Sequence, residues 1–499
     1  MCNLTGWCLA SADVPTDQPP PADPETVTRE TIDPAATALV GSSARLTLED
    51  RRAAGRAARG VRARRTFAEW TPAPDRPDPV ALIEAQNADR LQQLVPERHR
   101  RMLASPFAFY RGGAAIMAAD LGPLPSTGLV VQLCGDAHLA NFGMFGSPER
   151  SLVFDLNDFD ETHLGPFEWD VVRLAVSAAL LGRDHGWSPE LQEGLVRSAV
   201  ASYRTAVAEF ADRSNLDVWY SMLRVEELEQ MAPTEKDRSR LERSVAKARA
   251  NDLQRAVAKF TEVVDGRRRF RDDPPLLHRV ESFYPDGDGE RIAESVRRFL
   301  LDYVTSVPHD VQVLMVRYHV LDEAVKVVGV GSVGTRCYVV LGQGRDEDDL
   351  MILQVKQAVA SVLAPWWESP AFSSEGQRVV QGQRIMQAAT DPFLGWANIG
   401  DHDYYLRQFR DMKWSMDLVS LRPARAQRYL DLCGRTLARA HARSGDAVAI
   451  AAYLGESSRF DDALVECCRR YADQVELDYR AFAEAASSGR IEVAPGPTA

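Results

Sequence analysis

The chain has 499 residues, of which 45% are hydrophobic and 26% are charged, and its formal net charge is −12. This composition is typical of a folded globular protein, and the length predicts more than one sub-domain. The acidic balance argues against a protein that coats nucleic acid, and no apolar run reaches the ~18–20 residues of a membrane span.

Residues 1–45 are rich in proline and polar side chains, so we expect this segment to be disordered. Its beginning lacks a basic region followed by an apolar core, which disfavours a secretory signal. The seven cysteines contain no Cys-x-x-Cys pair, so neither a disulfide framework nor a zinc site is indicated. We therefore expect a cytoplasmic protein.

The rest of the chain alternates between helix-like and strand-like patterns. Its expected regions are 46–185 with N-terminal helices and candidate catalytic loops, 186–320 with helices, 321–420 with strands, and 421–490 with helices. Helices on both sides of one β-rich block predict an α+β fold.

The first candidate site follows two short apolar runs, 128–134 and 151–155. Asp136 and Asn141 form an Asp-x4-Asn pair after the first run, and Asp155 ends the second. A hairpin joining the two runs would bring the three side chains to one edge. Phosphoryl transfer uses a carboxylate near the nucleophile and oxygen ligands for Mg²⁺. We expect Asp136 to act as base and Asn141 and Asp155 to bind metal.

Asp158 is an alternative to Asp155 as a metal ligand, because the same segment also contains Asp160 and Glu161. Four neighbouring carboxylates repel one another unless a metal or basic partner lies nearby. The simpler interpretation is that these Asp and Asn residues only form turns.

His138 allows a second interpretation. The sequence Gly-Asp-Ala-His could supply Asp136 and His138 as ligands of a metal-dependent phosphoesterase. The other histidines do not stand in the contexts that such an enzyme needs, so we rank this interpretation below the kinase-like one.

The second candidate site is a Gly-x-Gly-x-x-Gly segment between strand-like runs at 325–330 and 336–341. A dinucleotide-binding loop would open a helix after its last glycine, whereas a loop between strands is typical of protein kinases. A plain hairpin is the simpler alternative. The residues expected to contact nucleotide phosphates are Gly329, Gly331, Ser332 and Gly334.

Lys356 ends the next apolar run, 350–356. A lysine in this position is typical of the strand that contacts nucleotide phosphates in kinases. A following helix should offer it a carboxylate, for which Glu368 and Glu375 are the candidates. A further run at 404–409 could lie under the adenine. The alternative is that Lys356 lies at a strand end in solvent.

Several stretches together resemble the bacterial domain-of-unknown-function 2252 family over about residues 60–485. They are SPFAFYRGGAAIMAADL, CGDAHLANFG, FDLNDFDETHLGPFEWDVVRLA, KVVGVGSVGTRCYVVL, LQVKQA, RVVQGQR and YYLRQFRDMK. This family is grouped with the protein-kinase-like superfamily, which includes aminoglycoside and choline phosphotransferases. The resemblance implies a bilobal kinase-like fold that uses ATP and Mg²⁺. It does not identify the acceptor.

The resemblance also bears on single residues. Asp136 and Asn141 match the His-Gly-Asp-x4-Asn loop of these phosphotransferases, with Cys134 in place of the histidine. Asp155 matches an Ile-Asp-Trp position, and Asp170 matches a downstream aspartate that braces the loop. Kinases carry the glycine loop and lysine before these motifs, so the reversed order here implies a circular permutation, with a large helical insert.

We therefore expect an ATP- and Mg²⁺-dependent phosphotransferase that acts on an unknown hydroxyl acceptor and has no nucleic-acid partner. The alternatives are a nucleotide-binding pseudokinase that regulates another protein, a nucleotidyl (AMP) transferase, and the phosphoesterase. ATP labelled at the γ or the α position distinguishes the phosphotransferase from the nucleotidyl transferase, and ATP-independent hydrolysis identifies the phosphoesterase.

Overall fold

The structure, a computed structural model, describes residues 46–230, 234–251, 253–284, 287–369, 372–409 and 412–496. Contacts divide the chain into Met1–Thr47 and Leu48–Ala499, and every element named below belongs to the second unit. The expected disorder of residues 1–45 concerns residues outside this description.

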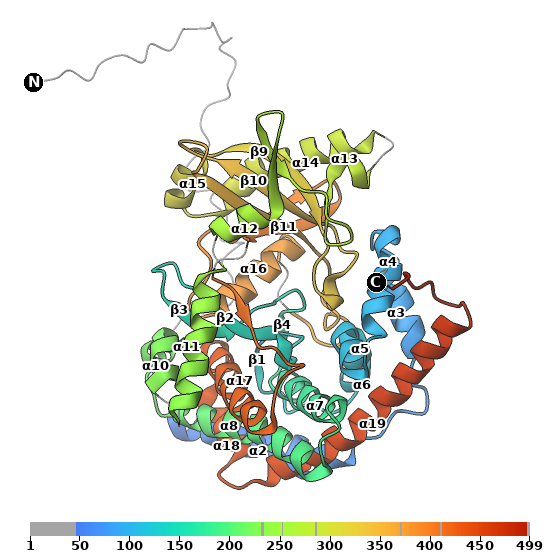
Figure 1. The fold of residues 1–499 in the computed structure, drawn as a ribbon. Coiled ribbons are helices and arrows are strands. Elements are labelled where there is room, and N and C mark those ends of the chain that lie inside the picture. The colour runs from blue at the N-terminus through green and yellow to red at the C-terminus, as the bar shows by residue number, and fades with distance from the viewer. Residues whose placement is uncertain are drawn as a thin grey trace, which may run out of the picture. The chain divides into compact units, whose positions relative to one another are not determined.

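One helix, α7 (Glu168–Asp184), is buried from Glu168 to Gly182 at the centre of a group of helices (Figure 1). The three long helices α8 (Pro189–Ala211), α17 (Pro423–Ser444) and α19 (Arg459–Ser487) pack against it, and α8 also packs against the other two. A helix enclosed on all sides must find partners for its polar side chains inside the protein. For Asp170 and Arg173 those partners include residues of the candidate site's loops.

The other helices surround this group or cover the large sheet. They are α2 (Leu48–Val61), α3 (Pro79–Asn87), α4 (Val95–Met102), α5 (Pro106–Gly112), α6 (Ala114–Leu121), α9 (Asn215–Tyr220), α10 (Val225–Gln230), α11 (Glu235–Arg249), α12 (Leu253–Phe260), α13 (Val280–Phe283), α14 (Asp288–Tyr303), α15 (His309–Met315), α16 (Glu375–Met386) and α18 (Ala447–Leu454). None of the helices described here has the length and hydropathy needed to cross a lipid bilayer.

Small antiparallel sheets carry the first candidate loops. In one, β1 (Val130–Leu133) pairs with β4 (His163–Pro166). In another, β2 (Phe142–Gly146) and β3 (Leu152–Leu156) form a hairpin flanked by β14 (Trp414–Ser415) and β5 (Leu223–Arg224). The predicted hairpin between the runs 128–134 and 151–155 is therefore wrong, because β2 takes the place of the first run beside β3.

A six-stranded antiparallel sheet forms the β-rich region, in the order β12-β13-β11-β10-β9-β8. Its strands are β8 (Leu277–Arg279), β9 (His319–Lys326), β10 (Cys337–Gln343), β11 (Leu350–Ala358), β12 (Gly395–Ile399) and β13 (His402–Gln408). The region 186–320, predicted as helical, contributes β8 and also the hairpin β6 (Thr261–Val264) and β7 (Arg267–Phe270). The predicted run 325–330 is wrong in extent, because β9 ends at Lys326 and Val330–Ser332 forms a 3₁₀ turn.

Alternation along the strands gives the sheet two different faces. On β11, Leu353 and Val355 pack in one apolar cluster with Phe299 of α14, whereas Ile352 packs in another with Phe260 of α12. Lys356 is an even number of residues from Ile352, so it points to the α12 side. This alternation brings the lysine to the face that meets the candidate catalytic loops.

Helix α16 connects β11 to β12 and contacts β11, β12, β13, α17 and β1. It is closely packed on both sides: a Cβ on Gly376 would lie 2.3 Å from the Tyr404 carbonyl oxygen, and one on Gly382 would lie 2.4 Å from Thr162 Oγ1. Helices and antiparallel sheets in one unit confirm the α+β class.

Candidate functional site

The loop after β1 is held by a carboxylate of the buried helix α7. Asp170 accepts hydrogen bonds from the backbone N–H groups of Cys134, at 2.6 Å, and Gly135, at 3.0 Å. Gly135 has a φ of +82°, and a Cβ there would lie 2.0 Å from the Glu161 carbonyl oxygen. Only glycine avoids both the left-handed strain and this clash. Asp170 therefore braces the loop that presents Asp136, as expected.

We expect Asp170→Asn to lower the free energy of unfolding by about 2–4 kcal/mol, because an amide cannot accept both backbone N–H groups with a full charge and its own NH₂ group faces donors. Urea unfolding measures the change. Asp473→Asn, at a side chain that is 54% exposed, is the matched control and should change stability little. Equal stability of the two variants would contradict the bracing role.

Asp136 lies at the tip of this loop and is paired with a second residue of α7. Arg173 Nε donates to Asp136 Oδ1 at 2.7 Å, and the guanidinium of Arg173 also stacks on Tyr110. Burial raises the pKa of Asp136, and Arg173 opposes that rise. A raised pKa makes a carboxylate a better proton acceptor near neutral pH.

Asn141 and His138 complete the loop. Asn141 Nδ2 donates a hydrogen bond to the Asp136 carbonyl oxygen at 2.7 Å. The side-chain oxygen of Asn141 is therefore the atom that can coordinate a metal ion. His138 Nε2 lies 3.6 Å from Asp136 Oδ2. Burial, helped by Arg111 and Arg173, lowers the pKa of His138 well below its usual value, so this imidazole is neutral.

Asp155 has a different environment from the one expected of a metal ligand. It forms an ion pair with Arg439 of α17, and both side chains are only 3% exposed. It also accepts a hydrogen bond from the Ala388 N–H at 3.2 Å. Asp155 lines neither of the two cavities described below, whereas Asp158 lines both.

Lys356 is 2% exposed and forms an ion pair with Asp160, while Asp158 Oδ1 lies 3.8 Å from its Nζ. Tyr405 Oη donates to Asp160 Oδ1 at 2.8 Å. Burial opposes the charge on Lys356, but Asp158 and Asp160 raise its pKa above the usual value. Although burial acts against it, Lys356 lowers the pKa of Asp160 to about 2. The pair is therefore charged at neutral pH.

The prediction that a helix after β11 offers Lys356 a carboxylate is wrong. Glu375 pairs with Arg378 of the same helix, and Glu368 is exposed. Arg378 instead binds the loop between β3 and β4, which contains Asp158 and Asp160. It donates hydrogen bonds to the carbonyl oxygens of Thr162 and, at 2.9 Å, of Asp160. Helix α16 thus holds the loop that carries the carboxylates, rather than offering one itself.

The glycine segment lies over this ion pair. Ser332 Oγ donates to Asp160 Oδ2 at 3.0 Å. Arg90 donates to the carbonyl oxygens of Val333, at 2.6 Å, and Gly331, at 2.9 Å. The segment is therefore fixed from both sides, which a plain hairpin between two strands would not require. Gly334 has a φ of +89° and closes the turn.

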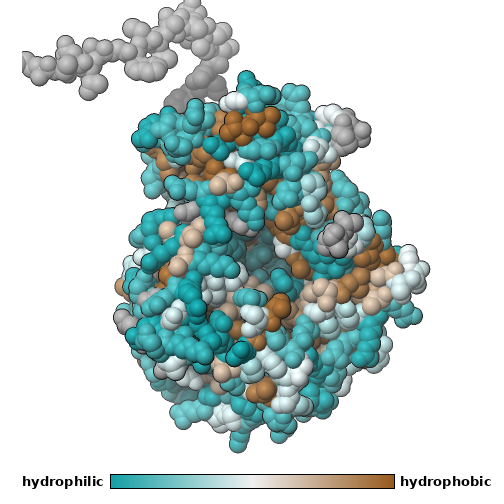
Figure 2. All heavy atoms as spheres, in the orientation of Figure 1, coloured by the Kyte–Doolittle hydropathy of each residue, from teal (hydrophilic) through white to brown (hydrophobic). Residues whose placement is uncertain are grey.

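A cavity of about 820 Å³ lies between the α12 side of the sheet and the catalytic loops. Five of the residues predicted from the sequence line it, and they are Asn141, Asp158, Gly329, Ser332 and Lys356. Figure 2 shows a hollow on this face, surrounded mainly by hydrophilic residues. A smaller cavity of about 80 Å³ adjoins it and is lined by Asp136, Asn141, Asp158, Gly329, Gly331 and Ser332, among others. Gly334 lines neither cavity.

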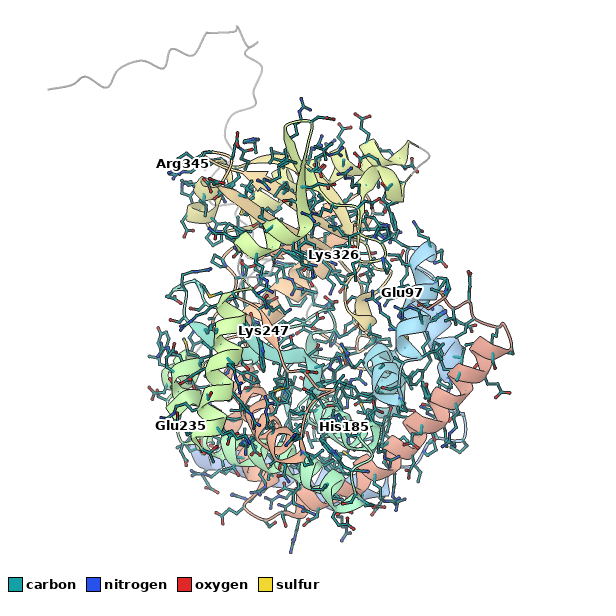
Figure 3. All side chains as sticks on the ribbon, viewed as in Figure 1. Glu97, His185, Glu235, Lys247, Lys326 and Arg345 are labelled. Atoms are coloured by element: carbon teal, nitrogen blue, oxygen red, sulfur yellow. The ribbon has the colours of Figure 1, made fainter. Side chains whose placement is uncertain are left out.

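The large cavity is basic although the chain is acidic. Lysine and arginine side chains outnumber the acidic residues of its described lining, which are Asp158 and Asp391. Lys326, at the end of β9, lies where the sheet faces the catalytic loops (Figure 3). Clefts of one charge with low-dielectric walls concentrate ligands of the opposite charge. The cavity is suited to a polyanion with an apolar portion, because Phe260, Phe393 and Phe409 also line it.

The acidic wall fits Mg²⁺ only in combination with a ligand. Asn141 and Asp158 present oxygen atoms to both cavities. In the described part of the chain no group of three or more His, Cys, Asp or Glu side chains is arranged to hold a metal. Mg²⁺ commonly binds through one or two carboxylates and the phosphates of a substrate. The residues present fit that mode.

Four functional residues of the site are not predicted by the sequence patterns. Asp160 was seen only as part of an acidic cluster, and Arg90, Arg111 and Arg173 were not singled out, although Arg111 closes the conspicuous stretch SPFAFYRG. Arginine next to glycine in an aromatic stretch is a signal that could have been used. The partners of these arginines lie far away in the chain, so their spacing carries no information.

Glu161 predicts a pH dependence of stability. Its carboxylate accepts a hydrogen bond from the Val362 N–H at 2.8 Å, yet burial raises its pKa from 4.5 to about 7. The folded protein then binds more protons than the unfolded chain in this range, so stability falls as pH rises from about 4.5 to 7. We expect Glu161→Gln to reduce the loss of stability between pH 5 and pH 8 by about 2.5 kcal/mol.

Urea unfolding at the two pH values measures this difference. Glu149→Gln, on the exposed turn between β2 and β3, should keep the pH slope of the natural protein. The same slope in Glu161→Gln would show that Glu161 does not titrate in this window.

Comparison with known proteins agrees with the family resemblance. Residues 90–485 match the family described as "Uncharacterized protein conserved in bacteria (DUF2252)". No curated protein and no solved structure matches the chain. Because the matched residues make up most of its length, the chain belongs to the bacterial DUF2252 family.

Proposed function

We propose that the protein is an ATP- and Mg²⁺-dependent phosphotransferase with a circularly permuted kinase-like fold. The observation that carries this proposal is the buried ion pair of Lys356 with Asp160, beneath a glycine segment and beside a basic cavity. A buried lysine that is paired with carboxylates and faces a cavity is arranged for phosphate, which would compete for the same cation.

The order of elements around the cavity supports the kinase-like part of the proposal. The glycine segment joins the antiparallel strands β9 and β10, and Lys356 lies on the neighbouring strand β11. Asp136, Asn141 and Asp158 follow β1 on the other side of the cavities. Protein kinases use a glycine-rich loop, a strand lysine, and a catalytic loop with Asp and Asn, followed by a metal-binding Asp.

The end of α17 supports the permutation. Ser444 Oγ accepts a hydrogen bond from the Gln132 N–H at 2.9 Å, so α17 ends beside the strand that leads into the Asp136 loop. In an unpermuted kinase-like chain these two segments would be consecutive. Here α17 follows the β-rich region, and the catalytic loops precede it.

Each part has a role in the proposed reaction. Phe260 and Phe409, whose rings meet edge to face at 5.6 Å, offer an apolar wall for the base. The glycine segment and Lys356 hold the phosphates. Asn141 and Asp158 would bind Mg²⁺, which neutralises charge on the phosphates when it is present. Asp136 orients the acceptor hydroxyl and accepts its proton as the hydroxyl oxygen bonds to the γ-phosphorus, while the bond from that phosphorus to the bridging oxygen breaks and ADP leaves.

The test is incubation of the full chain with Mg²⁺ and ATP labelled at either the γ or the α position. Transfer from the γ position alone supports the proposal, and transfer from the α position alone would replace it with nucleotidyl transfer. Binding of ATP without any transfer, unaffected by Asp136→Asn, would indicate a pseudokinase. Hydrolysis of phosphoesters without ATP would indicate the phosphoesterase.

A further inference from the structure

The smaller cavity lies on the side where the proposed function places the acceptor. Asp136, Arg98 and Glu161 line this cavity and not the larger one, whereas Lys356 lines only the larger one. Arg111, Asn141, Asp158, Gly329 and Ser332 line both and mark the junction. Its volume of about 80 Å³ is that of two to three waters in the liquid, or of one small ionic group.

In the described part of the chain, two arginines that line this cavity have a guanidinium N–H group with no hydrogen-bond acceptor. Arg98 on α4 has no exposed surface, and its buried Nε has no hydrogen-bond partner among the residues that the structure describes. Arg111, near the end of α5, likewise has a buried and unpartnered Nε. In the described part of the chain, neither guanidinium forms an ion pair. Such buried charges are costly unless a counter-ion joins them.

The carboxylates of the same wall are already engaged. Asp136 is paired with Arg173, and Asp160 with Lys356. Glu161 accepts the Val362 N–H and points to that backbone. Arg90 donates hydrogen bonds to carbonyl oxygens of the glycine segment. Among the arginines of this wall, Arg98 and Arg111 are therefore the two whose buried guanidinium Nε–H groups have no acceptor among the described residues.

We propose that this cavity binds an anionic group of the acceptor, so that the acceptor is a small hydroxylated compound with a phosphate or carboxylate close to the reacting hydroxyl. The inference rests on the proposed function and adds the substrate class. Arg98 and Arg111 hold the anion, while Asp136, on the same wall, meets the hydroxyl. The hydroxyl oxygen then forms its bond to the γ-phosphorus, ADP leaves, and the proton passes to Asp136.

The alternative explanation is that the two arginines bind the γ-phosphate of ATP rather than an anionic group of the acceptor. A titration distinguishes the two explanations. Inorganic phosphate is titrated calorimetrically into the full chain saturated with Mg²⁺ and either ADP or a non-hydrolysable ATP analogue. We expect phosphate to bind in both cases. Binding with ADP but not with the analogue would assign the arginines to the nucleotide and overturn the inference, as would the absence of phosphate binding.

Variants test which side chains hold the anion. Arg111→Gln and Arg98→Gln should each weaken phosphate binding at least about tenfold, the effect of losing a charged hydrogen bond. Arg345→Gln, on the exposed turn between β10 and β11, is the matched control, because Arg345 lines neither cavity. Arg98 also donates hydrogen bonds to Asn87 and to the Gly112 carbonyl oxygen, so its loss can destabilise the fold. If Arg98→Gln does not fold, Arg111→Gln alone tests the inference. Unchanged affinity in Arg111→Gln would overturn the inference.

Transfer assays then separate this inference from the proposed function. With γ-labelled ATP, hydroxy acids and phosphorylated sugars should accept label, and which of the two does so identifies the anion. The uncharged controls glycerol and glucose should not. Label on uncharged alcohols alone would overturn the anionic acceptor but leave the phosphotransferase intact. If no nucleotide binds, the proposed function fails, and phosphate titration of the nucleotide-free chain still tests the cavity.

Discussion

Asp158→Asn is expected to lower the rate of γ-phosphoryl transfer at saturating ATP by at least about 10²-fold, the cost of losing one preorganised electrostatic contact. Asp158 lines both cavities together with Asn141, and its side chain is 36% exposed. The substitution removes a charged oxygen ligand for Mg²⁺, so the Mg²⁺ concentration needed for half-maximal rate should rise. The fold should survive, because Asp160 still pairs with Lys356.

Asp155→Asn is the matched variant, with the opposite expected result. It would leave Arg439 buried without its carboxylate, and breaking such a pair typically costs about 3–5 kcal/mol of stability. The rate per folded molecule should change little. Urea unfolding and the labelled-ATP assay on both variants measure the two effects. A folded Asp155→Asn protein that loses transfer, beside an active Asp158→Asn protein, would return the metal site to Asp155.

Lys356→Met is the second variant with a large expected effect. We expect it to reduce transfer by about 10²–10³-fold and the free energy of unfolding by about 3–5 kcal/mol, because Asp160 and Asp158 lose the buried cation that lies between them. Methionine is an unbranched side chain only one atom shorter than lysine, so the loss is mainly one of charge rather than packing.

The double variant Lys356→Met/Asp160→Asn separates stability from function. Replacing both partners of a buried pair with neutral groups removes the uncompensated charge, so we expect it to regain part of the stability but none of the transfer. Calorimetric ATP titration should show weak binding in both variants. Recovery of transfer in the double variant would mean that Lys356 serves only to neutralise Asp160.

The sequence predicted the parts of the candidate site whose signals are local. The Asp-x4-Asn loop, the glycine segment and the strand lysine each consist of neighbouring residues, and the apolar run 350–356 is enough to identify the strand that carries Lys356. The predicted strand end at Lys356 is wrong, because β11 continues to Ala358. The structure brings Asp136, Asn141, Gly329, Gly331 and Ser332 to one pair of adjoining cavities, and Lys356 to the larger of them.

The choice between Asp155 and Asp158 could not be made in this way. Both follow the same strand, and both are carboxylates in one acidic cluster. The difference lies in what each one meets: Asp155 meets Arg439 of a helix near the C-terminus, and Asp158 meets a cavity. Neither neighbour is visible in the local pattern.

The partner of Lys356 shows the same limit. A carboxylate on the next helix was expected from the kinase pattern, but the lysine pairs with Asp160, which comes from the catalytic loop on the other side of the cavity. The short distance along the chain favoured Glu375, although distance along the chain does not decide which charges are buried together.

The amino-acid sequence by itself determined the α+β class, the family, and the local motifs around Asp136, the glycine segment and Lys356, because each depends on composition, periodicity or adjacent residues. Only the tertiary structure decided that β2 rather than β1 pairs with β3, that Asp160 neutralises Lys356, and that Arg98 and Arg111 keep buried Nε–H groups without an acceptor among the described residues. These features depend on burial, where the cost of an unpaired charge selects partners by proximity in space and not by order along the chain.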